Sequence, residues 1–396
     1  MAEGDGRGGQ MFDERRRQAA LDELHILDTP RDERVDRVAR LAQEMFGVPM
    51  VSVSLLDRDR QWRKTEIGLG SDEAPRQDSF CDYTVSQDRT VVIEDASRTE
   101  TFADNPFVVG DPHLRFYAGH PLHAPGGEPI GTLCVLDTEP HTLSDAQRGL
   151  LRDLAFWVQT ELANDAELDH AAVIQSALRP HRHPTVAGYT IAGGVASRGR
   201  LAGDFYDLGL HHGVLRITLA DAMGKGTGPA LVAASVRASL RTAPERPIAE
   251  AIAEADRLLE EDLADTAMFV TAVHAELHPE SGELQIIDAG HSLAFILRSD
   301  GSWDHLRSTS LPLGMGMGLE PPEVRQPRIT RLEPGDALVC CSDGLLDVLD
   351  PDDPYGHVYR VLTTLGPDGA IREALRLADG DSATDDITVV VVRRDA

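Results

Sequence analysis

Three apolar strand-like segments in the second half of this 396-residue chain end or begin at aspartates. Asp221 follows the run LRITLA, Asp343 follows ALVCCS, and Asp385 lies two residues before the first residue of ITVVVV. A carboxylate at the edge of a hydrophobic core is costly unless it is paired or bound to a cation. The pattern therefore predicts a fold in which several buried strands bring carboxylates to a common polar edge.

A fourth acidic turn, Gly203–Asp207 (GDFYD), and the charge balance point to the same chemistry. The chain has 66 Asp and Glu against 38 Lys and Arg, and its formal net charge is −28. Clustered carboxylates with few lysines suit a hard cation such as Mg²⁺ or Mn²⁺. Two such ions, about 3.5–4 Å apart, can activate a water for in-line attack on phosphorus. Each Asp-Gly pair alone is typical of a simple turn, but four acidic turns together favour the cation site.

Composition also excludes some partners and predicts a compartment. The strong negative charge argues against binding to nucleic acid or to anionic membranes, because both bind basic protein surfaces. Four cysteines without a Cys-x-x-Cys pair predict a reducing compartment rather than a disulfide framework. Residues 1–20 lack the apolar core of a signal peptide, and no apolar stretch is long enough to span a bilayer. We expect a cytoplasmic protein.

The length and the order of the segments predict two domains. We expect a disordered tail over residues 1–14, a first domain over 15–165, a helical linker over 166–185 and a second domain over 186–396. Apolar residues at helical spacing predict one long helix, or two, between Thr142 and Leu178. Because the strand segments of the second half are interrupted by helical ones, we expect an α+β fold.

Several other candidate motifs do not fit the sequence. The glycines around Lys225 lack the Gly-x-x-x-x-Gly-Lys-Ser/Thr spacing of a phosphate-binding loop. No cysteine is followed six residues later by arginine, so a cysteine-based phosphatase is excluded. The pairs His181/His183 and His211/His212 are interpreted as exposed loop histidines rather than metal ligands.

Residues from about 186 to 394 resemble the metal-dependent (PPM-type) serine/threonine phosphatases, specifically their bacterial SpoIIE/RsbU-like branch. Seven blocks follow the family's order: Leu201–Asp207, Asp221–Gly226, Met268–Ala272, Asp288–His291, Leu332–Asp336, Ser342–Leu345 and Asp385–Thr388. The sequence departs from the family pattern at Ala202, where the family has Gly, and at Asp288, where it usually has Asn. Neither change removes a metal ligand.

The resemblance implies an α/β/β/α sandwich with a two-metal Mn²⁺ or Mg²⁺ site at one edge. It implies direct attack of a metal-bridging water on phosphoserine or phosphothreonine, without a phospho-enzyme. In this family pattern Asp221 bridges both ions, and Asp207 and Asp386 are neighbours. The residues that the resemblance assigns to the metal ions are Asp204, Asp221, the backbone carbonyl of Ala222, Asp343 and Asp385. A phosphate-binding arginine cannot be assigned; Arg198 and Arg200 are nearby candidates.

Residues from about 15 to 165 resemble a GAF sensor domain, which implies an antiparallel sheet with helices. The matching segments are Ile26–Pro30, Asp59–Trp62, Asp78–Cys81, Arg115–Gly119 and Ile130–Asp137. A GAF fold is a binding scaffold, so it predicts a sensor without identifying the ligand. Cys81 and Cys134 either sense redox or hold a chromophore, or are small buried hydrophobic residues; we favour the second interpretation.

The resemblance implies a GAF-regulated signalling phosphatase whose substrate is a phosphorylated anti-sigma-factor antagonist. The helical stretch over residues 144–178 either pairs with a second copy of the chain and transmits the signal, or simply closes the GAF domain.

Two other functions remain open. One is a non-catalytic binding module that has kept the fold, which the retained aspartates argue against. The other is a phosphatase of small phosphoesters.

Overall fold

The computed structural model describes residues 14–242, 246–264, 266, 268–308, 310–315, 325–350, 352–380 and 383–396. These residues form two compact units, which divide between Asp169 and His170. Apart from Glu14, the tail expected over residues 1–14 lies outside the described residues.

The first unit is built on one antiparallel six-stranded sheet, in the strand order β3-β2-β1-β6-β5-β4. Its strands are β1 (Met50–Leu56), β2 (Arg60–Ile67), β3 (Glu73–Pro75), β4 (Val91–Ile93), β5 (Phe116–His123) and β6 (Pro129–Asp137). Its helices are α1 (Glu14–Glu23), α2 (Glu33–Phe46), α3 (Phe80–Gln87), α4 (Pro106–Val109) and the first part of α5 (Asp145–Leu178). Two short 3₁₀ turns, Arg76–Asp78 and Ala96–Arg98, complete the unit.

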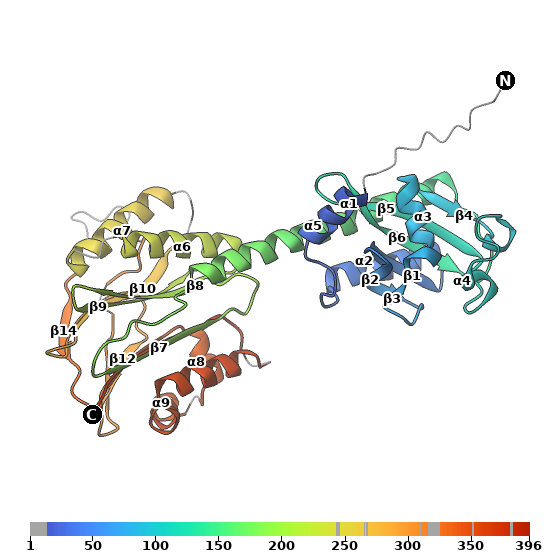
Figure 1. The fold of residues 1–396 in the computed structure, drawn as a ribbon. Coiled ribbons are helices and arrows are strands. Elements are labelled where there is room, and N and C mark those ends of the chain that lie inside the picture. Colours follow the sequence, from blue (N-terminus) through green and yellow to red (C-terminus); the bar gives the residue numbers. More distant parts are fainter. Residues whose placement is uncertain are drawn as a thin grey trace. The chain divides into compact units, whose positions relative to one another are not determined.

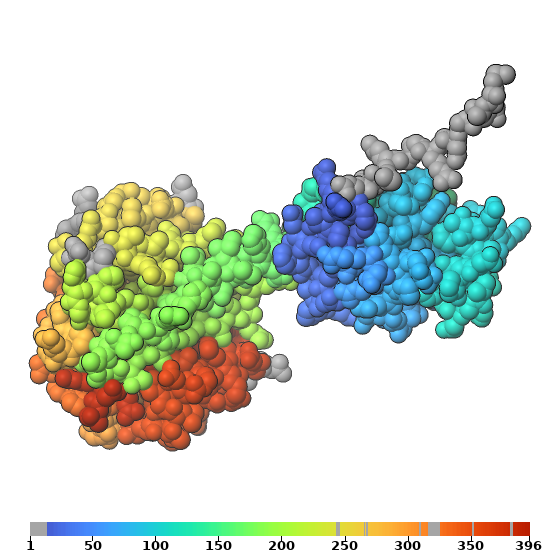
Figure 2. All heavy atoms as spheres, viewed as in Figure 1, coloured from blue at the N-terminus to red at the C-terminus, as the bar shows by residue number. Residues whose placement is uncertain are grey.

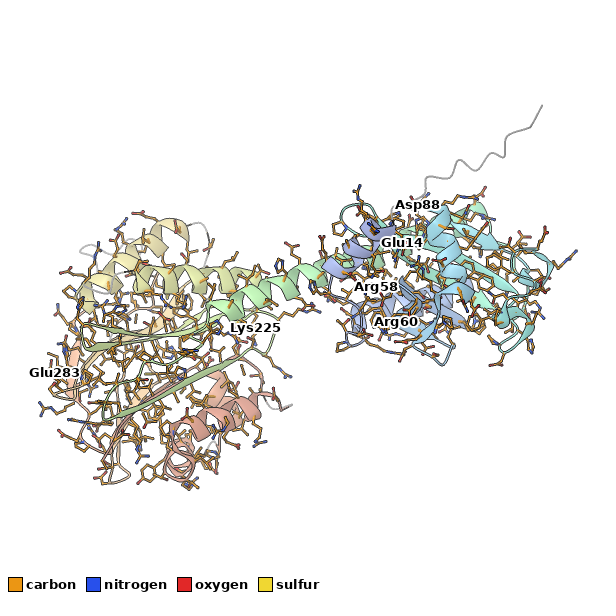
Figure 3. All side chains as sticks on the ribbon, in the orientation of Figure 1. Glu14, Arg58, Arg60, Asp88, Lys225 and Glu283 are labelled. Carbon is orange, nitrogen blue, oxygen red and sulfur yellow. The ribbon has the colours of Figure 1, made fainter. Side chains whose placement is uncertain are left out.

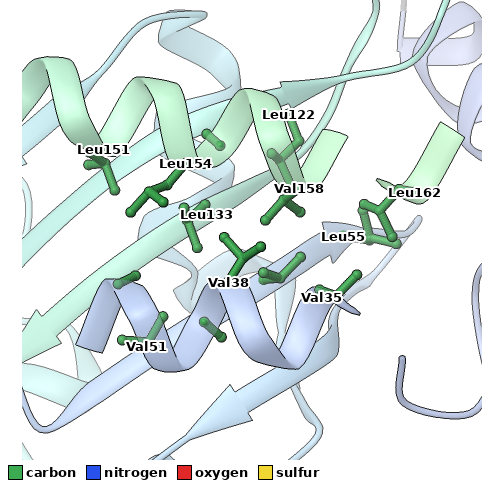
Figure 4. Packing of buried hydrophobic residues seen from close by; sticks show 14 of the residues in the cluster. Val35, Val38, Val51, Leu55, Leu122, Leu133, Leu151, Leu154, Val158 and Leu162 are labelled. Carbon is green, nitrogen blue, oxygen red and sulfur yellow. The ribbon is translucent and has the colours of Figure 1, made fainter. Parts of the chain in front are cut away.

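Both faces of this sheet are covered by apolar side chains. On one face, α1, α2 and α5 share a core with β1 and β6, and Figure 4 shows side chains of α2 and α5 meeting over the sheet. On the other face, residues of α3 and α4 pack with Tyr117 and Cys134. Because both faces are covered, β1 and β6 are buried along their whole length, including the serines Ser52 and Ser54 that alternate with apolar residues in β1.

Helix α5 is a single 34-residue helix that begins in the first unit and ends in the second. Its buried apolar residues Leu151, Leu154, Val158 and Leu162 all belong to the first unit's core. Beyond Leu162 the helix has no fully buried apolar side chain, and it exposes Val173, Ile174 and Leu178.

The second unit contains two five-stranded antiparallel sheets, in the strand orders β14-β11-β10-β9-β8 and β13-β12-β15-β16-β7. The strands are β7 (Tyr189–Ala196), β8 (Asp204–His211), β9 (Val214–Ala222), β10 (Val270–His278), β11 (Glu283–Ala289), β12 (Ala294–Leu297), β13 (Trp303–His305), β14 (Arg328–Arg331), β15 (Ala337–Cys341) and β16 (Ile387–Arg394). The helices are α6 (Thr227–Arg241), α7 (Ile248–Asp262), α8 (Gly344–Val348) and α9 (Pro354–Ala378).

These elements stack in four layers. A central core with Leu219, Val273 and Val390 joins the two sheets, because alternate residues of their strands point inward. Helices α6 and α7 cover the outer face of the first sheet, and α8 and α9 cover the outer face of the second (Figure 1). Figure 2 shows the α6–α7 layer in yellow and the α9 layer in red on opposite sides of this unit.

The structure confirms the predicted α+β fold class, with a helix-covered antiparallel sheet first and an α/β/β/α sandwich second. Among the described helices, none combines the length and the apolar character that a membrane crossing requires.

Candidate metal centre

A two-residue turn places the first two predicted ligands opposite each other. Strands β8 and β9 are joined by His212 and Gly213, which both have positive φ (48° and 81°). Two positive φ values are typical of the tight hairpin turns that match strand twist and fix the register. In this register Asp204, at the start of β8, pairs with Asp221 near the end of β9. His212 therefore lies at the far end of the hairpin, away from the aspartates.

The Asp204 carboxyl is buried in an unfavourable environment. Its side chain is 5% exposed, and Oδ2 has no hydrogen-bond partner among the described residues. Burial, and then the charge of Asp221, raise the pKa of Asp204 well above its usual value. A buried carboxylate of this kind is stable only when protonated or when a cation compensates its charge.

Asp221 shares this environment with the other two predicted ligands. Burial raises its pKa most, the charge of Asp343 raises it further, and Asp385 adds a smaller effect of the same sign. The four aspartates of the sequence prediction therefore lie within one electrostatic neighbourhood, which draws on both sheets of the sandwich.

Lys225, which is labelled in Figure 3, brings a positive charge to Asp385 of this group. Its Nζ lies 3.0 Å from Asp385 Oδ2 and donates a 2.7 Å hydrogen bond to the Thr384 carbonyl oxygen. The Lys225 side chain is 61% exposed, so the pair is accessible to solvent ions. In the sequence, Lys225 lies within the Asp221–Gly226 block and the rejected phosphate-loop pattern, but neither predicts its contact with Asp385.

The backbone beside Asp204 leaves the carbonyl oxygen of Ala222, at the end of β9, accessible to a ligand. A Cβ at Gly203 would lie 3.0 Å from the carbonyl oxygen of Ala222, so glycine leaves that oxygen uncrowded. Within the described ranges, no three His, Cys, Asp or Glu side chains form a ready-made set of metal ligands. The donors present are nevertheless carboxylate and carbonyl oxygens with excess negative charge, which fits a hard divalent cation.

The two neighbouring aspartates named from the sequence have structural partners. Asp207 forms ion pairs with Arg237 (3.2 Å) and Arg241 (3.1 Å) of helix α6. Asp386 accepts hydrogen bonds from the backbone amides of Arg198 (2.7 Å) and Gly203 (2.9 Å), and so holds the segment that leads into β8.

His291 is a site residue that the sequence block contained but did not assign. It is 7% exposed, its Nε2 lies 2.8 Å from the Cys341 carbonyl oxygen, and its Nδ1 lies 2.9 Å from the Thr271 hydroxyl. Thr271 is the β10 neighbour of Asp221, and Cys341 ends β15 just before Asp343. His291 therefore links β10, the strand paired with Asp221, to the end of β15, two residues before Asp343.

The remaining sequence candidates lie elsewhere or have other partners. His183 contacts the Tyr206 hydroxyl at 3.1 Å, and His181 contacts the Ala177 carbonyl oxygen at 3.2 Å. Arg198 and Arg200 are exposed on the loop between β7 and β8. None of these contacts singles out a phosphate-binding arginine.

Helix α5 contacts the segment directly before Asp204. The Gln175 side chain donates from Nε2 to the Ala202 carbonyl oxygen (2.7 Å) and accepts at Oε1 from the Ala202 amide (3.0 Å). Arg179 donates to the Ser197 hydroxyl at 2.8 Å in the same β7–β8 loop. Helical periodicity could predict the helix but not these contacts, because they depend on where the loop folds.

Comparison with known proteins also divides the chain into two parts, and the division between the two compact units at residues 169 and 170 lies between the matched ranges. Residues 30–162 match the GAF domain, and residues 211–395 match the family described as stage II sporulation protein E (SpoIIE). Asp204 precedes the first residue of the SpoIIE match. The predicted domain limits at 165 and 186 stay predictions.

Two curated relatives correspond to different parts of the chain. A cyclic di-GMP phosphodiesterase of Pseudomonas aeruginosa is 41% identical over 128 residues, 32% of this chain and 22% of the relative, in the GAF region. The phosphoserine phosphatase RsbU of Bacillus subtilis is 25% identical over 193 residues, 48% of this chain and 56% of RsbU. The chain thus spans less than two thirds of the length of either relative. Among solved structures, the SiaA-PP2C domain of Pseudomonas aeruginosa aligns at 21% identity and a TM-score of 0.49, covering 60% of this chain and 98% of that domain.

Proposed function

From the premise that the chain joins a GAF domain to a SpoIIE-family, PP2C-type phosphatase domain, we propose that it is a metal-dependent protein serine/threonine phosphatase. The observation that carries the proposal is the pairing of Asp204 with Asp221 in one hairpin register, with a buried, unpartnered carboxylate oxygen beside it. Asp343 and Asp385 add to the same negative field.

We assign the cation ligands to Asp204, Asp221, the Ala222 carbonyl, Asp343 and Asp385. Bound Mn²⁺ or Mg²⁺ supplies Lewis acidity toward a phosphoryl group and lowers the pKa of water. The chain's own residues hold this arrangement in place. Asp386 fixes the segment before Asp204 through two backbone amides, and His291 joins β10, the strand paired with Asp221, to the end of β15, just before Asp343.

The proposed substrate is a phosphoserine or phosphothreonine of another protein. RsbU bears the name of a phosphoserine phosphatase, and the resemblance stated from the sequence extends this to a phosphorylated anti-sigma-factor antagonist in the cytoplasm. Whatever lies beyond the phosphate must be recognised outside the cation site, because the metal chemistry itself concerns only the phosphoryl group.

The GAF domain is proposed to regulate this activity through helix α5. The helix belongs to both units, and its Gln175 side chain holds both polar groups of the Ala202 backbone, two residues before Asp204. A shift or rotation of α5 would therefore displace the segment that positions Asp204. The exposed apolar residues Phe156, Trp157, Val173 and Ile174 on the same helix support pairing with a second copy of the chain.

Hydrolysis of an aryl phosphate and of a phosphoserine peptide by the full chain tests the proposal. Both are assayed with Mn²⁺, with Mg²⁺ and with a chelator, in the wild type and in Asp221→Asn and Asp343→Asn. Asp207→Asn is the matched control, because its carboxylate is engaged by arginines of α6. We expect metal-dependent activity that is lost in the first two variants and kept in the control.

The same assay separates the alternatives. Rates that favour small phosphate esters over the phosphopeptide would indicate a phosphatase of small phosphoesters. A folded chain that binds Mn²⁺ but releases no phosphate, with residues 1–180 present or deleted, would indicate a binding module and overturn the proposal.

A further inference from the structure

The first unit buries two cysteines side by side, away from the aspartates. Cys81 lies in the first turn of α3 and Cys134 lies in β6, and their Sγ atoms are 3.7 Å apart. We propose that Cys81 and Cys134 are a redox-active dithiol, which a small hydroperoxide entering the adjacent cavity converts to a disulfide. The proposal concerns the GAF domain alone and does not depend on the phosphatase activity.

The surroundings of the two sulfur atoms give them different roles. Ser79 caps α3 and accepts a hydrogen bond from the Cys81 amide, so the Cys81 thiol lies at the positive end of a helix. The Tyr117 hydroxyl donates toward Cys81 Sγ at 3.8 Å, whereas the single proton of the Cys134 thiol is shared between the Ser52 carbonyl oxygen at 3.5 Å and Cys81 Sγ at 3.7 Å. Cys81 is therefore placed as the thiolate and Cys134 as the thiol.

Electrostatics agrees with this division. The hydrogen bond from the Cys134 thiol, followed by those from hydroxyl groups such as that of Tyr117, lowers the pKa of Cys81 to about 6 despite its burial. The hydrogen bond to Cys81, and then burial, raise the pKa of Cys134 well above its usual value. A thiolate is the nucleophilic form of cysteine, so Cys81 is the residue expected to react first.

A cavity gives small molecules access to the pair. Its volume is roughly 530 Å³, and both cysteines line it together with Arg63, Phe80 and Tyr117. Arg63 is only 8% exposed, and its Nε has no hydrogen-bond partner among the described residues. The charged Arg63 side chain gives the wall of this cavity a polar feature suited to a small molecule that carries an oxygen atom.

The reaction balances without any other component. The Cys81 thiolate attacks one peroxide oxygen; the S–O bond forms, the O–O bond breaks, and the leaving alkoxide takes a proton to give an alcohol. The Cys134 sulfur then attacks Cys81; the S–S bond forms, the S–O bond breaks, and hydroxide leaves with the Cys134 proton as water. The two thiols lose two electrons, and the hydroperoxide gains them.

The other two cysteines provide an internal contrast. Cys340 and Cys341 are consecutive residues of the buried strand β15. Burial raises the pKa of Cys341 to about 12 and that of Cys340 still higher, so neither is a thiolate at neutral pH. For a disulfide, the Sγ–Sγ distance between Cys81 and Cys134 must shorten from 3.7 Å to about 2.05 Å.

The test treats the reduced full-length chain with tert-butyl hydroperoxide and counts thiols after denaturation. We expect two of the four thiols to be lost, a non-reducing peptide map that links Cys81 to Cys134, and recovery of all four with dithiothreitol. Cys340→Ser should still lose two thiols and Cys81→Ser none. Cys134→Ser should stop at a sulfenic acid on Cys81 that dimedone traps.

The pH profile of the wild type gives a second readout that needs no variant. Oxidation through a thiolate of pKa about 6 changes little in rate between pH 7 and 8.5, whereas an ordinary thiol, with a pKa near 8.5, speeds up about tenfold or more. Four intact thiols after exposure to hydroperoxide, or a disulfide that includes Cys340 or Cys341, would overturn the proposal. So would a rate that rises with pH as an ordinary thiol's does.

Discussion

Removing the Gln175 side chain should loosen the segment that positions Asp204. Gln175→Ala deletes both hydrogen bonds to the backbone of Ala202, a residue with no exposed surface. A hydrogen bond of this kind contributes about 0.5–1.5 kcal/mol, so the pair stabilises the local conformation by about 1–3 kcal/mol. This corresponds to a change of about 5- to 150-fold in the equilibrium between closed and open forms of the loop.

Hydrogen exchange measures this change without assuming any activity. In the wild type the Ala202 amide is held by Gln175 Oε1, so peptides that cover residues 201–204 should exchange faster in Gln175→Ala by a factor within that range. Gln159→Ala is the matched control: it is a glutamine of the same helix whose Oε1 accepts from the His123 amide in the first unit. If the proposed function holds, the apparent affinity for Mn²⁺ weakens in Gln175→Ala only. Unchanged exchange at Ala202 in a folded Gln175→Ala chain would refute the reasoning.

Three further predictions concern single side chains of the second unit. Lys225→Met should tighten the apparent affinity for Mn²⁺ in calorimetric titration, because it removes a cation held 3.0 Å from Asp385, and should change the free energy of unfolding by less than about 1 kcal/mol because the pair is exposed. Weaker Mn²⁺ binding would contradict this. Asp207→Asn should lower the free energy of unfolding in urea by about 1–3 kcal/mol through loss of its arginine pairs, yet leave Mn²⁺ affinity unchanged. Burial lowers the pKa of His274 to about 3, so only the unfolded chain takes up this proton between about pH 6.5 and 3. Relative to His274→Gln, the wild type should then lose up to about 1.4 kcal/mol of unfolding free energy per unit as pH falls through that window, and equal slopes would count against a buried neutral His274.

The fold class could be predicted because the apolar segments of the sequence are clearly bounded by turns and polar residues. Strands such as β15 and β16 are short apolar runs next to acidic turns, and the structure places both in the inner sheet layers. The long helix was predicted as one helix or two. It is one helix: its first half packs in the first unit's core, and Gln175 in its second half contacts Ala202 of the β7–β8 loop.

The site was only partly predictable, because its contacts join residues far apart in the chain. The acidic turns identified Asp204 and Asp221 as candidates, but their direct pairing depends on the two-residue turn at His212 and Gly213. The roles of Lys225 and His291 depend on neighbours more than a hundred and about fifty residues away, respectively. Likewise, Cys81 and Cys134 were favoured as inert core residues, and only the fold shows that their sulfur atoms meet.

Direct titration of the purified full chain with Mn²⁺ tests the central claim, that the aspartates around Asp221 form a divalent-cation site. The account predicts two bound ions per chain in the wild type, loss of binding in Asp221→Asn, and unchanged binding in Asp207→Asn. A wild-type chain that binds no Mn²⁺ at neutral pH, or an Asp221→Asn chain that binds it as the wild type does, would contradict the account.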